Sequence, residues 1–164
     1  FTCVQAQENN VKVDDGVKKT YFQSGALQSE VHFIKGKEDG TVKYFYENGS
    51  IRGEADFVQG KKEGIAKTYF ENGKISGEVN YTLGKQDGIT RLYFRDGVLK
   101  AEQHYKQGKL EGLSKLFNEE GELKYEKVYK NDRLTILKEF GSDGKLLFEE
   151  AYDKKGNSKE KIFK

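Results

Sequence analysis

The chain lacks several residue types on which common protein classes depend. Its 164 residues include no proline, tryptophan or methionine, and the one cysteine is Cys3. A single thiol excludes an internal disulfide and a cysteine-based zinc cluster. No apolar run approaches the ~20 residues that cross a bilayer as a helix. A charge excess is also missing, because 29 basic and 27 acidic side chains leave a net charge of +2. This balance argues against a nucleic-acid-binding surface.

Glycine and aromatic residues are abundant instead. The chain has 19 glycines, 10 tyrosines and 11 phenylalanines, while 34% of its residues are charged. So few aliphatic side chains do not fill a thick, closed core, and so many rings are not typical of a disordered chain. The composition therefore predicts a thin structure with short-range packing.

The glycines recur with a fixed period. One series is spaced by 24 residues and comprises Gly16, Gly40, Gly64, Gly88 and Gly112. A second series follows nine residues later, at Gly25, Gly49, Gly73, Gly97 and Gly121. A fixed period is the sequence signature of a repeat architecture. We assign repeats to residues 16–39, 40–63, 64–87, 88–111, 112–134 and 135–152, the sixth being one residue short in its entry loop.

Each repeat contains two strand-like runs joined by tight turns. In the third repeat, residues 65–71 and 74–82 flank Asn72-Gly73, a dipeptide typical of a type I′ hairpin turn. A second tight reversal at residues 83–86 leaves no room for a crossover helix. The sequence therefore predicts an all-β fold, an elongated single-layer antiparallel meander of about twelve strands built from 24-residue β-hairpin repeats over residues 16–152.

The predicted register places opposite charges side by side. With these turns, Lys67 faces Glu78, and Glu78 in turn faces Arg91. The same register gives a charge ladder along the whole sheet: Lys19, Glu30, Lys43, Glu54, Lys67, Glu78, Arg91, Glu102, Lys115 and Glu126. Facing pairs of this kind contribute ~0.2–1 kcal/mol each, and a slipped strand would bring like charges together. We interpret the ladder as structural.

The opposite face is predicted to hold the apolar core. On that face Phe70 pairs with Ile75 across its hairpin, and Tyr81 covers Gly88 of the next strand, as aromatic side chains cover strand glycines. The equivalent residues of the first, second and fourth repeats are predicted to make both contacts. In the fifth repeat Asn118 breaks the aromatic column and Lys127 the aliphatic one.

A row of aromatic residues falls on the charged face and is the predicted partner-binding site: Tyr21, Phe45, Tyr69, Tyr93 and Phe117. These rings either pack over the aliphatic stems of neighbouring lysines and arginines or form anchors ~10 Å apart for an extended partner.

The repeat pattern G-x-x-K-x-Y-F-x-N-G-x-I-x-x-E-x-x-Y-x-x-G-K resembles the MORN repeat. The 24-residue form is most similar to the bacterial variant found in antitoxin-like MORN-repeat proteins. The resemblance covers about residues 16–152 and implies a β-hairpin repeat fold. It also implies one of three activities, namely protein–protein contact, phospholipid association or toxin neutralisation. The family brings no catalytic residues.

Candidate catalytic groups are scarce. His32 and His104 occupy the same repeat position three units apart, ~30 Å along the sheet, too far to share a metal or a proton. A flat sheet gives little of the shelter that general acid–base chemistry requires. We therefore predict no enzyme activity, no catalytic residue, no cofactor, no metal and no small-molecule substrate.

The two ends of the chain carry separate predictions. Residues 1–6, with the small Val4 and Ala6, resemble the end of a secretory signal, and residues 7–15 form an N-terminal leader. This favours an extracytoplasmic location (periplasmic, envelope or secreted) over a cytoplasmic one. Cys3 is either a lipidation site or part of the removed signal. Residues 153–164 are predicted to be a solvated, Lys-rich C-terminal tail.

The sequence as a whole predicts a non-catalytic scaffold that holds a protein partner on an extended sheet face. Two alternatives stay open: association with anionic lipid through the basic tail, and an antitoxin or immunity protein that neutralises a toxin. Nucleic acid is not an expected partner. The unpaired edges of the first and last strands also permit oligomers to form through the edge strands.

Overall fold

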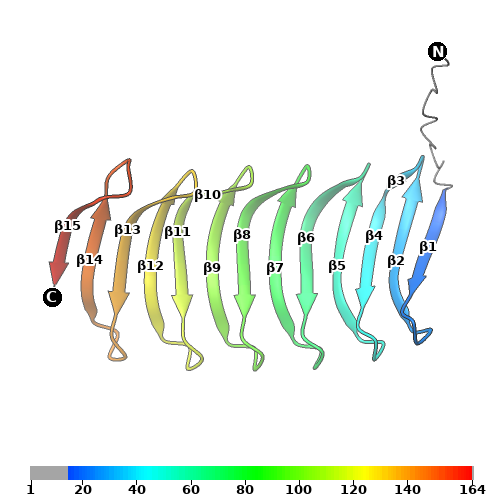
Figure 1. Cartoon of the computed structure of the whole chain (residues 1–164), viewed down its shortest axis with the longest axis horizontal. Coiled ribbons are helices and arrows are strands. Elements are labelled where there is room, and N and C mark those ends of the chain that lie inside the picture. The colour runs from blue at the N-terminus through cyan, green and yellow to red at the C-terminus, as the bar shows by residue number, and fades with distance from the viewer. Residues whose placement is uncertain (1–14, 164) are drawn as a thin grey trace, which may run out of the picture.

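A computed structural model describes residues 15–163 as one open antiparallel sheet (Figure 1). These residues contain no helix, and so none that is long and apolar enough to cross a membrane. The strands are β1 (Gly16–Tyr21), β2 (Leu27–Ile34), β3 (Lys37–Glu38), β4 (Gly40–Phe45), β5 (Ile51–Val58), β6 (Lys61–Tyr69), β7 (Ile75–Thr82), β8 (Lys85–Tyr93), β9 (Leu99–Lys106), β10 (Lys109–Leu110), β11 (Gly112–Phe117), β12 (Leu123–Lys130), β13 (Arg133–Phe140), β14 (Leu146–Tyr152) and β15 (Ser158–Phe163).

The strands follow one another across the sheet in chain order, as the meander predicts. The two shortest, β3 and β10, pair only with the strand before them and lead directly into β4 and β11. Counting each as part of the strand that it begins, residues 16–152 supply the twelve expected strands. The predicted fold class is therefore confirmed.

The Asn-Gly turns differ from the predicted type. Gly73 N donates to Phe70 O (2.9 Å), and Phe70 N donates to Lys74 O (2.8 Å), so three residues form the loop. Only Gly73 has a positive φ (81°). This is a type I turn followed by a left-handed glycine, because Asn72 keeps a right-handed backbone while its Oδ1 accepts from Lys74 N (3.1 Å).

Type I′ turns occur instead at the opposite ends of the strands, where one repeat connects to the next. Leu83 (φ 51°) and Gly84 (φ 83°) both lie in the left-handed region, and Thr82 pairs with Lys85 directly across them. A left-handed conformation costs a non-glycine residue roughly 1–2 kcal/mol. Contacts from the preceding repeat hold the turn. Glu63 Oε2 accepts from Leu83 N (2.8 Å), and Lys62 O accepts from Gly84 N (2.8 Å).

We call this contact between a carboxylate and a turn amide in the next repeat the turn clasp. It recurs through the array, always between residues 20 positions apart: Asp15 to Lys35, Asp39 to Gln59, Asp87 to Gln107, and Glu111 to Asn131. Backbone bonds of the Gly84 type accompany the clasps at Gly60, Gly108 and Asp132. The turns at this side of the sheet therefore stack on one another.

Bulges beside both kinds of turn correct the register. Thr68 pairs with Gly77 but Tyr69 pairs with Ile75, so Ser76 is an extra residue in its strand. A second irregularity lies between Val79 and Tyr81. The predicted pairing of Phe70 with Ile75 is wrong, because the extra residue moves Ile75 to the face that carries Tyr69.

The charge ladder has the predicted register throughout. Lys67 lies opposite both Glu54 and Glu78, and every successive pair of the ladder is a pair of Cα partners. Lys138 and Glu149 continue it beyond Glu126. Ion pairs within 4.0 Å join Lys19 to Glu30 (3.1 Å), Arg91 to Glu102 (2.9 Å), Lys115 to Glu126 (4.0 Å) and Lys138 to Glu149 (3.6 Å).

The opposite face holds the small core. Val42 is fully buried, and Ala55 and Phe57 pack with it, flanked by the partly buried Val31 and Ala66. The predicted aromatic cover of the strand glycines is wrong. The bulge separates Tyr81 from Gly88, so Tyr81 is instead the partner of Gly64 in the preceding strand. Among residues 15–163, no side chain beyond those of the adjacent residues lies within 4 Å of the place that a Gly64 β-carbon would occupy.

The Lys-rich segment at the C-terminus is part of the sheet rather than a solvated tail. Ser158–Phe163 forms β15, which pairs with β14 across a turn that begins at Asp153. The turn forms because Asp153 Oδ1 accepts from Lys155 N (2.7 Å) and from Asn157 N (2.9 Å). Lys161 Nζ lies 4.4 Å from the Phe148 ring centroid. Residues 1–6 with Cys3, and residues 7–14 of the leader, lie outside the described residues.

Candidate functional site

The predicted aromatic row lies on the ladder face, as the sequence indicates. Each ring follows a ladder cation by two residues in its strand, so the row runs beside the ladder at ~6.7 Å along the strands. Its members are Tyr21 in β1, Phe45 in β4, Tyr69 in β6, Tyr93 in β8 and Phe117 in β11.

The structure adds an aliphatic residue between successive rings. Ile75 faces Tyr69 on this surface, and Ile51 faces Phe45 in the same way. The shortened sixth repeat contributes Phe140 opposite Leu146, which the 24-residue spacing does not reveal. Together these side chains form what we call the apolar stripe: Tyr21, Leu27, Phe45, Ile51, Tyr69, Ile75, Tyr93, Leu99, Phe117, Leu123, Phe140 and Leu146.

The apolar stripe is open to solvent along its length. Tyr21 is 59% exposed and Ile51 is 36% exposed, and the other ten residues are half-buried. No second layer covers the stripe within residues 15–163, because these residues form a single sheet. A continuous apolar surface bordered by charged side chains is typical of an interaction site.

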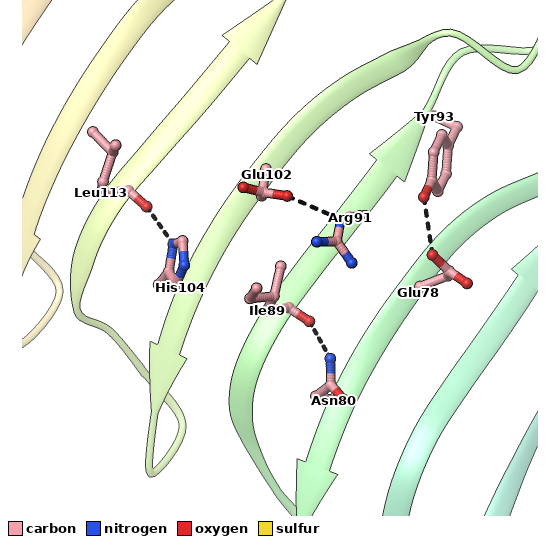
Figure 2. A network of polar contacts seen from close by, with 8 residues as sticks. All are labelled: Glu78, Asn80, Ile89, Arg91, Tyr93, Glu102, His104 and Leu113. Atoms are coloured by element: carbon pink, nitrogen blue, oxygen red, sulfur yellow. Dashed lines mark hydrogen bonds and ion pairs between the residues drawn. The ribbon is translucent and has the colours of Figure 1, made fainter.

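Two rings of the stripe are fixed by hydrogen bonds to the ladder. Tyr69 Oη donates to Glu54 Oε1 (2.7 Å), and Tyr93 Oη donates to Glu78 Oε2 (2.9 Å). Figure 2 shows the second bond beside the Arg91–Glu102 ion pair. Partial burial of the phenol and the hydrogen bond to the Glu54 carboxylate raise the pKa of Tyr69 to about 12. Burial of the phenol and its hydrogen bond to the Glu78 carboxylate also raise the pKa of Tyr93.

The ladder charges beside these two rings are not equally satisfied. Glu54 and Glu78 accept the phenol hydrogen bonds, and Arg91 is paired with Glu102. Lys43 and Lys67, by contrast, have no carboxylate oxygen of residues 15–163 within 4.0 Å of Nζ. An open hollow of about 410 Å³ adjoins Lys67 and is also lined by Glu54, Asp56 and Ile65. The middle of the stripe therefore borders two lysines that face ladder glutamates but make no direct ion pair with them.

The two histidines contact main-chain carbonyl oxygens within the sheet. His104 Nδ1 lies 2.7 Å from Leu113 O, and Asn80, at the same repeat position, donates through Nδ2 to Ile89 O (2.6 Å) (Figure 2). His32 Nδ1 lies 3.1 Å from Asp39 O. These side chains reach main-chain carbonyls beside the bulges. Among the described residues, no group of three or more histidine, cysteine, aspartate or glutamate side chains is arranged to hold a metal ion.

The aliphatic residues that sequence reasoning missed in the first five repeats share one cause. The bulge beside the three-residue turn of each hairpin places Leu27, Ile51, Ile75, Leu99 and Leu123 on the stripe rather than on the core face. A signal for this bulge is present in the sequence. Each of these residues follows its turn glycine by two positions, the spacing of a three-residue loop with a left-handed glycine.

A comparison with curated proteins finds no match for the chain. Among family models, that of the MORN repeat variant matches five segments, residues 14–35, 38–59, 62–82, 86–107 and 110–131, which together cover more than half of the chain. The segments recur with the period of the hairpin repeats. The chain therefore belongs to the MORN repeat variant family, whose repeats are commonly binding or scaffold modules.

Proposed function

We propose that this protein is a non-catalytic scaffold that binds a protein partner along the apolar stripe. One observation carries the proposal. Each of twelve strands in a one-layer sheet contributes one apolar side chain to the stripe, and residues 15–163 provide no second layer to cover these side chains. Burying such side chains contributes ~25 cal/mol per Å² of apolar area, so a partner that covers the stripe gains free energy that the isolated sheet does not.

The rigidity of the stripe supports the same proposal. Tyr69 and Tyr93 are already oriented by Glu54 and Glu78, so binding orders few additional rotamers. Each rotamer-rich side chain that must be immobilised costs an interface ~0.5–1.5 kcal/mol. Rings of this kind, flanked by charged groups, are the residue types that dominate binding energy in protein interfaces.

The test compares two double variants in affinity capture from an extract of the native cells, quantified by mass spectrometry. Tyr69→Ala with Tyr93→Ala removes two anchors of the stripe. Val58→Ala with Leu83→Ala removes two apolar side chains that are 55% and 68% exposed and lie outside the stripe. We expect the Tyr69→Ala, Tyr93→Ala variant to fail to capture a protein that the wild type and the Val58→Ala, Leu83→Ala variant both capture. Circular dichroism spectra of both variants serve as the control for retention of the fold. Equal capture by all three chains contradicts the proposal.

The two alternatives from the sequence give different results in companion experiments. Binding to anionic lipid predicts flotation with phosphatidylserine vesicles at low salt. We expect no flotation, since the C-terminal lysines belong to a paired strand in which Lys161 lies directly opposite Glu150. A bacterial, antitoxin-like role predicts that the captured protein is toxic when expressed alone and harmless when co-expressed with the wild type. That result identifies the partner as a toxin, and the stripe variant then fails to protect.

A further inference from the structure

The repeat geometry narrows the kind of partner that fits the apolar stripe. We infer that the stripe binds an acidic, proline-rich peptide segment in the polyproline II conformation, with its acidic residues spaced by three. The inference rests on the proposed function, because it names the chemistry of the partner for the same surface. It follows from the spacing of the stripe, its side-chain chemistry and its unpaired cations.

The spacing of the stripe matches one peptide conformation best. Equivalent rings are two strands apart, which is ~9.6 Å at ~4.8 Å per strand. A polyproline II helix has three residues per turn and rises ~3.1 Å per residue, so equivalent side chains recur every ~9.3 Å on one side. Over the four intervals from Tyr21 to Phe117, the sheet advances ~38 Å and twelve polyproline II residues advance ~37 Å.

Other conformations do not keep this match. Two turns of an α-helix advance ~10.8 Å, so eight turns overshoot the same four intervals by ~5 Å, about half a repeat. A β-strand advances ~10 Å in three residues, but its side chains alternate between faces. Every second anchor of a strand would therefore point away from the stripe.

The side chains of the stripe suit proline. Surfaces that recognise polyproline II segments are lined by aromatic rings, and here an aliphatic side chain separates each ring from the next, as Ile51 and Ile75 flank Tyr69. The phenol bond to Glu54 holds that ring in place. A polyproline II ligand is itself preformed, so neither side loses much conformational entropy on binding.

The charges beside the stripe select the sign of the ligand. Lys43 and Lys67 are equivalent residues of adjacent repeats, and both lack a carboxylate within 4.0 Å among residues 15–163. They stand one repeat apart, which is three polyproline II residues. Glu54 and Glu78 stay anionic, but each directs a carboxylate oxygen to a phenol hydroxyl rather than to these lysines. Acidic residues spaced by three therefore meet both cations, while prolines cover the rings and the aliphatic side chains.

The experiment measures fluorescence anisotropy of labelled peptides added to the full chain. The test peptide has four Pro-Pro-Glu triplets. Its matched control has four prolines, four glutamates and four more prolines, so that composition and net charge are the same and the period differs. We expect the triplet peptide to bind about tenfold more tightly. A peptide of Pro-Pro-Lys triplets and an acidic helical peptide of equal charge are expected to bind more weakly still.

Matched protein variants test the contacts. An exposed ion pair contributes up to ~1 kcal/mol, about fivefold in affinity. Lys43→Gln with Lys67→Gln is therefore expected to weaken binding of the triplet peptide about tenfold. The control, Lys61→Gln with Lys85→Gln, removes two exposed lysines beside the type I′ turns and is expected to leave binding unchanged.

Each contrary outcome has a defined meaning. Equal binding of the triplet peptide and its matched control overturns the inference. Tighter binding of the helical peptide, lost in the Tyr69→Ala, Tyr93→Ala variant, also overturns it but leaves the proposed function standing. Self-association in the ultracentrifuge that this variant abolishes would show that a second copy occupies the stripe, and would again overturn the inference. If no peptide binds and the stripe variant captures every protein that the wild type captures, both proposals fail.

Discussion

Exchanging valine and threonine between two equivalent core positions gives a direct test of the one-layer core. Residues 42, 66, 90 and 114 occupy the same place in successive repeats and face the core side. Val42 is completely buried and apolar, whereas Thr90 is 5% exposed and Ser114 is 1% exposed. The Thr90 and Ser114 hydroxyl oxygens are buried without a hydrogen-bond partner among the described residues. Thr90→Val and Val42→Thr therefore have opposite expected effects.

The magnitude follows from the cost of burying an unpaired polar group. Such a hydroxyl costs ~1–3 kcal/mol, and valine replaces it with a methyl group of similar size. We expect Thr90→Val to raise the free energy of unfolding by about 1–2 kcal/mol. Val42→Thr is expected to lower it by at least as much, because position 42 is the more completely buried. Ser114→Ala, which removes a hydroxyl and adds no methyl group, should lie between the wild type and Thr90→Val.

Urea and thermal unfolding, followed by the β-sheet signal in circular dichroism, measure these changes. For a chain of this size, 1 kcal/mol shifts Tm by ~2–4 °C, so Thr90→Val is expected to raise Tm by ~3–6 °C. The urea slope should not change if the unfolded states are alike. A Tm for Thr90→Val at or below the wild-type value, or a neutral Val42→Thr, would refute the assignment of this column to a dry core.

Three further predictions test the ladder, the turn clasp and the tyrosine row. Lys67→Glu places a third carboxylate between two ladder glutamates and should lower the free energy of unfolding by ~1–2 kcal/mol. The loss should be smaller in 1 M salt, because salt screens exposed charges. An equal loss at low and high salt would count against the ladder. Glu63→Ala should lower the free energy of unfolding by ~1 kcal/mol and speed hydrogen exchange at the Leu83 amide. Glu63→Asp should restore both, because aspartate holds three of the equivalent clasps. The raised pKa of Tyr69 means that its contribution to stability is complete below pH 10 and disappears as the pH rises through about 12; Tyr69→Phe should flatten that part of the stability profile, and an ordinary phenol titration near pH 10 would contradict the bond to the carboxylate.

The sequence predicts the register of this sheet well because two independent patterns agree on it. The 24-residue glycine series defines the hairpins, and a shift of one residue would place Lys67 beside no ladder glutamate at all. The aromatic row follows from the same register. Its position relative to the ladder depends only on the i, i+2 spacing within each strand.

The turns and the aliphatic half of the stripe were not predictable in the same way. Asn-Gly is compatible with both a type I′ turn and a type I turn that ends in a left-handed glycine, and the choice between them decides which face Ile75 occupies. Leu83 is a poor residue for a left-handed conformation, and the group that stabilises it, Glu63, comes from the preceding repeat. The segment after Asp153 appears too polar for a strand until its pairing with β14 is known.

The turn clasps give the array a direction and a unit of change. In each clasp a carboxylate reaches forward to the following unit, so one repeat depends on its predecessor for the shape of its turn. Duplicating or deleting a block of 24 residues between residues 16 and 131 leaves the 20-residue distance between clasp partners intact, and it also preserves the alternation of cations and anions from strand to strand. Duplication or loss of one repeat in the gene can therefore lengthen or shorten the binding surface by one hairpin, without any new contact between neighbouring repeats.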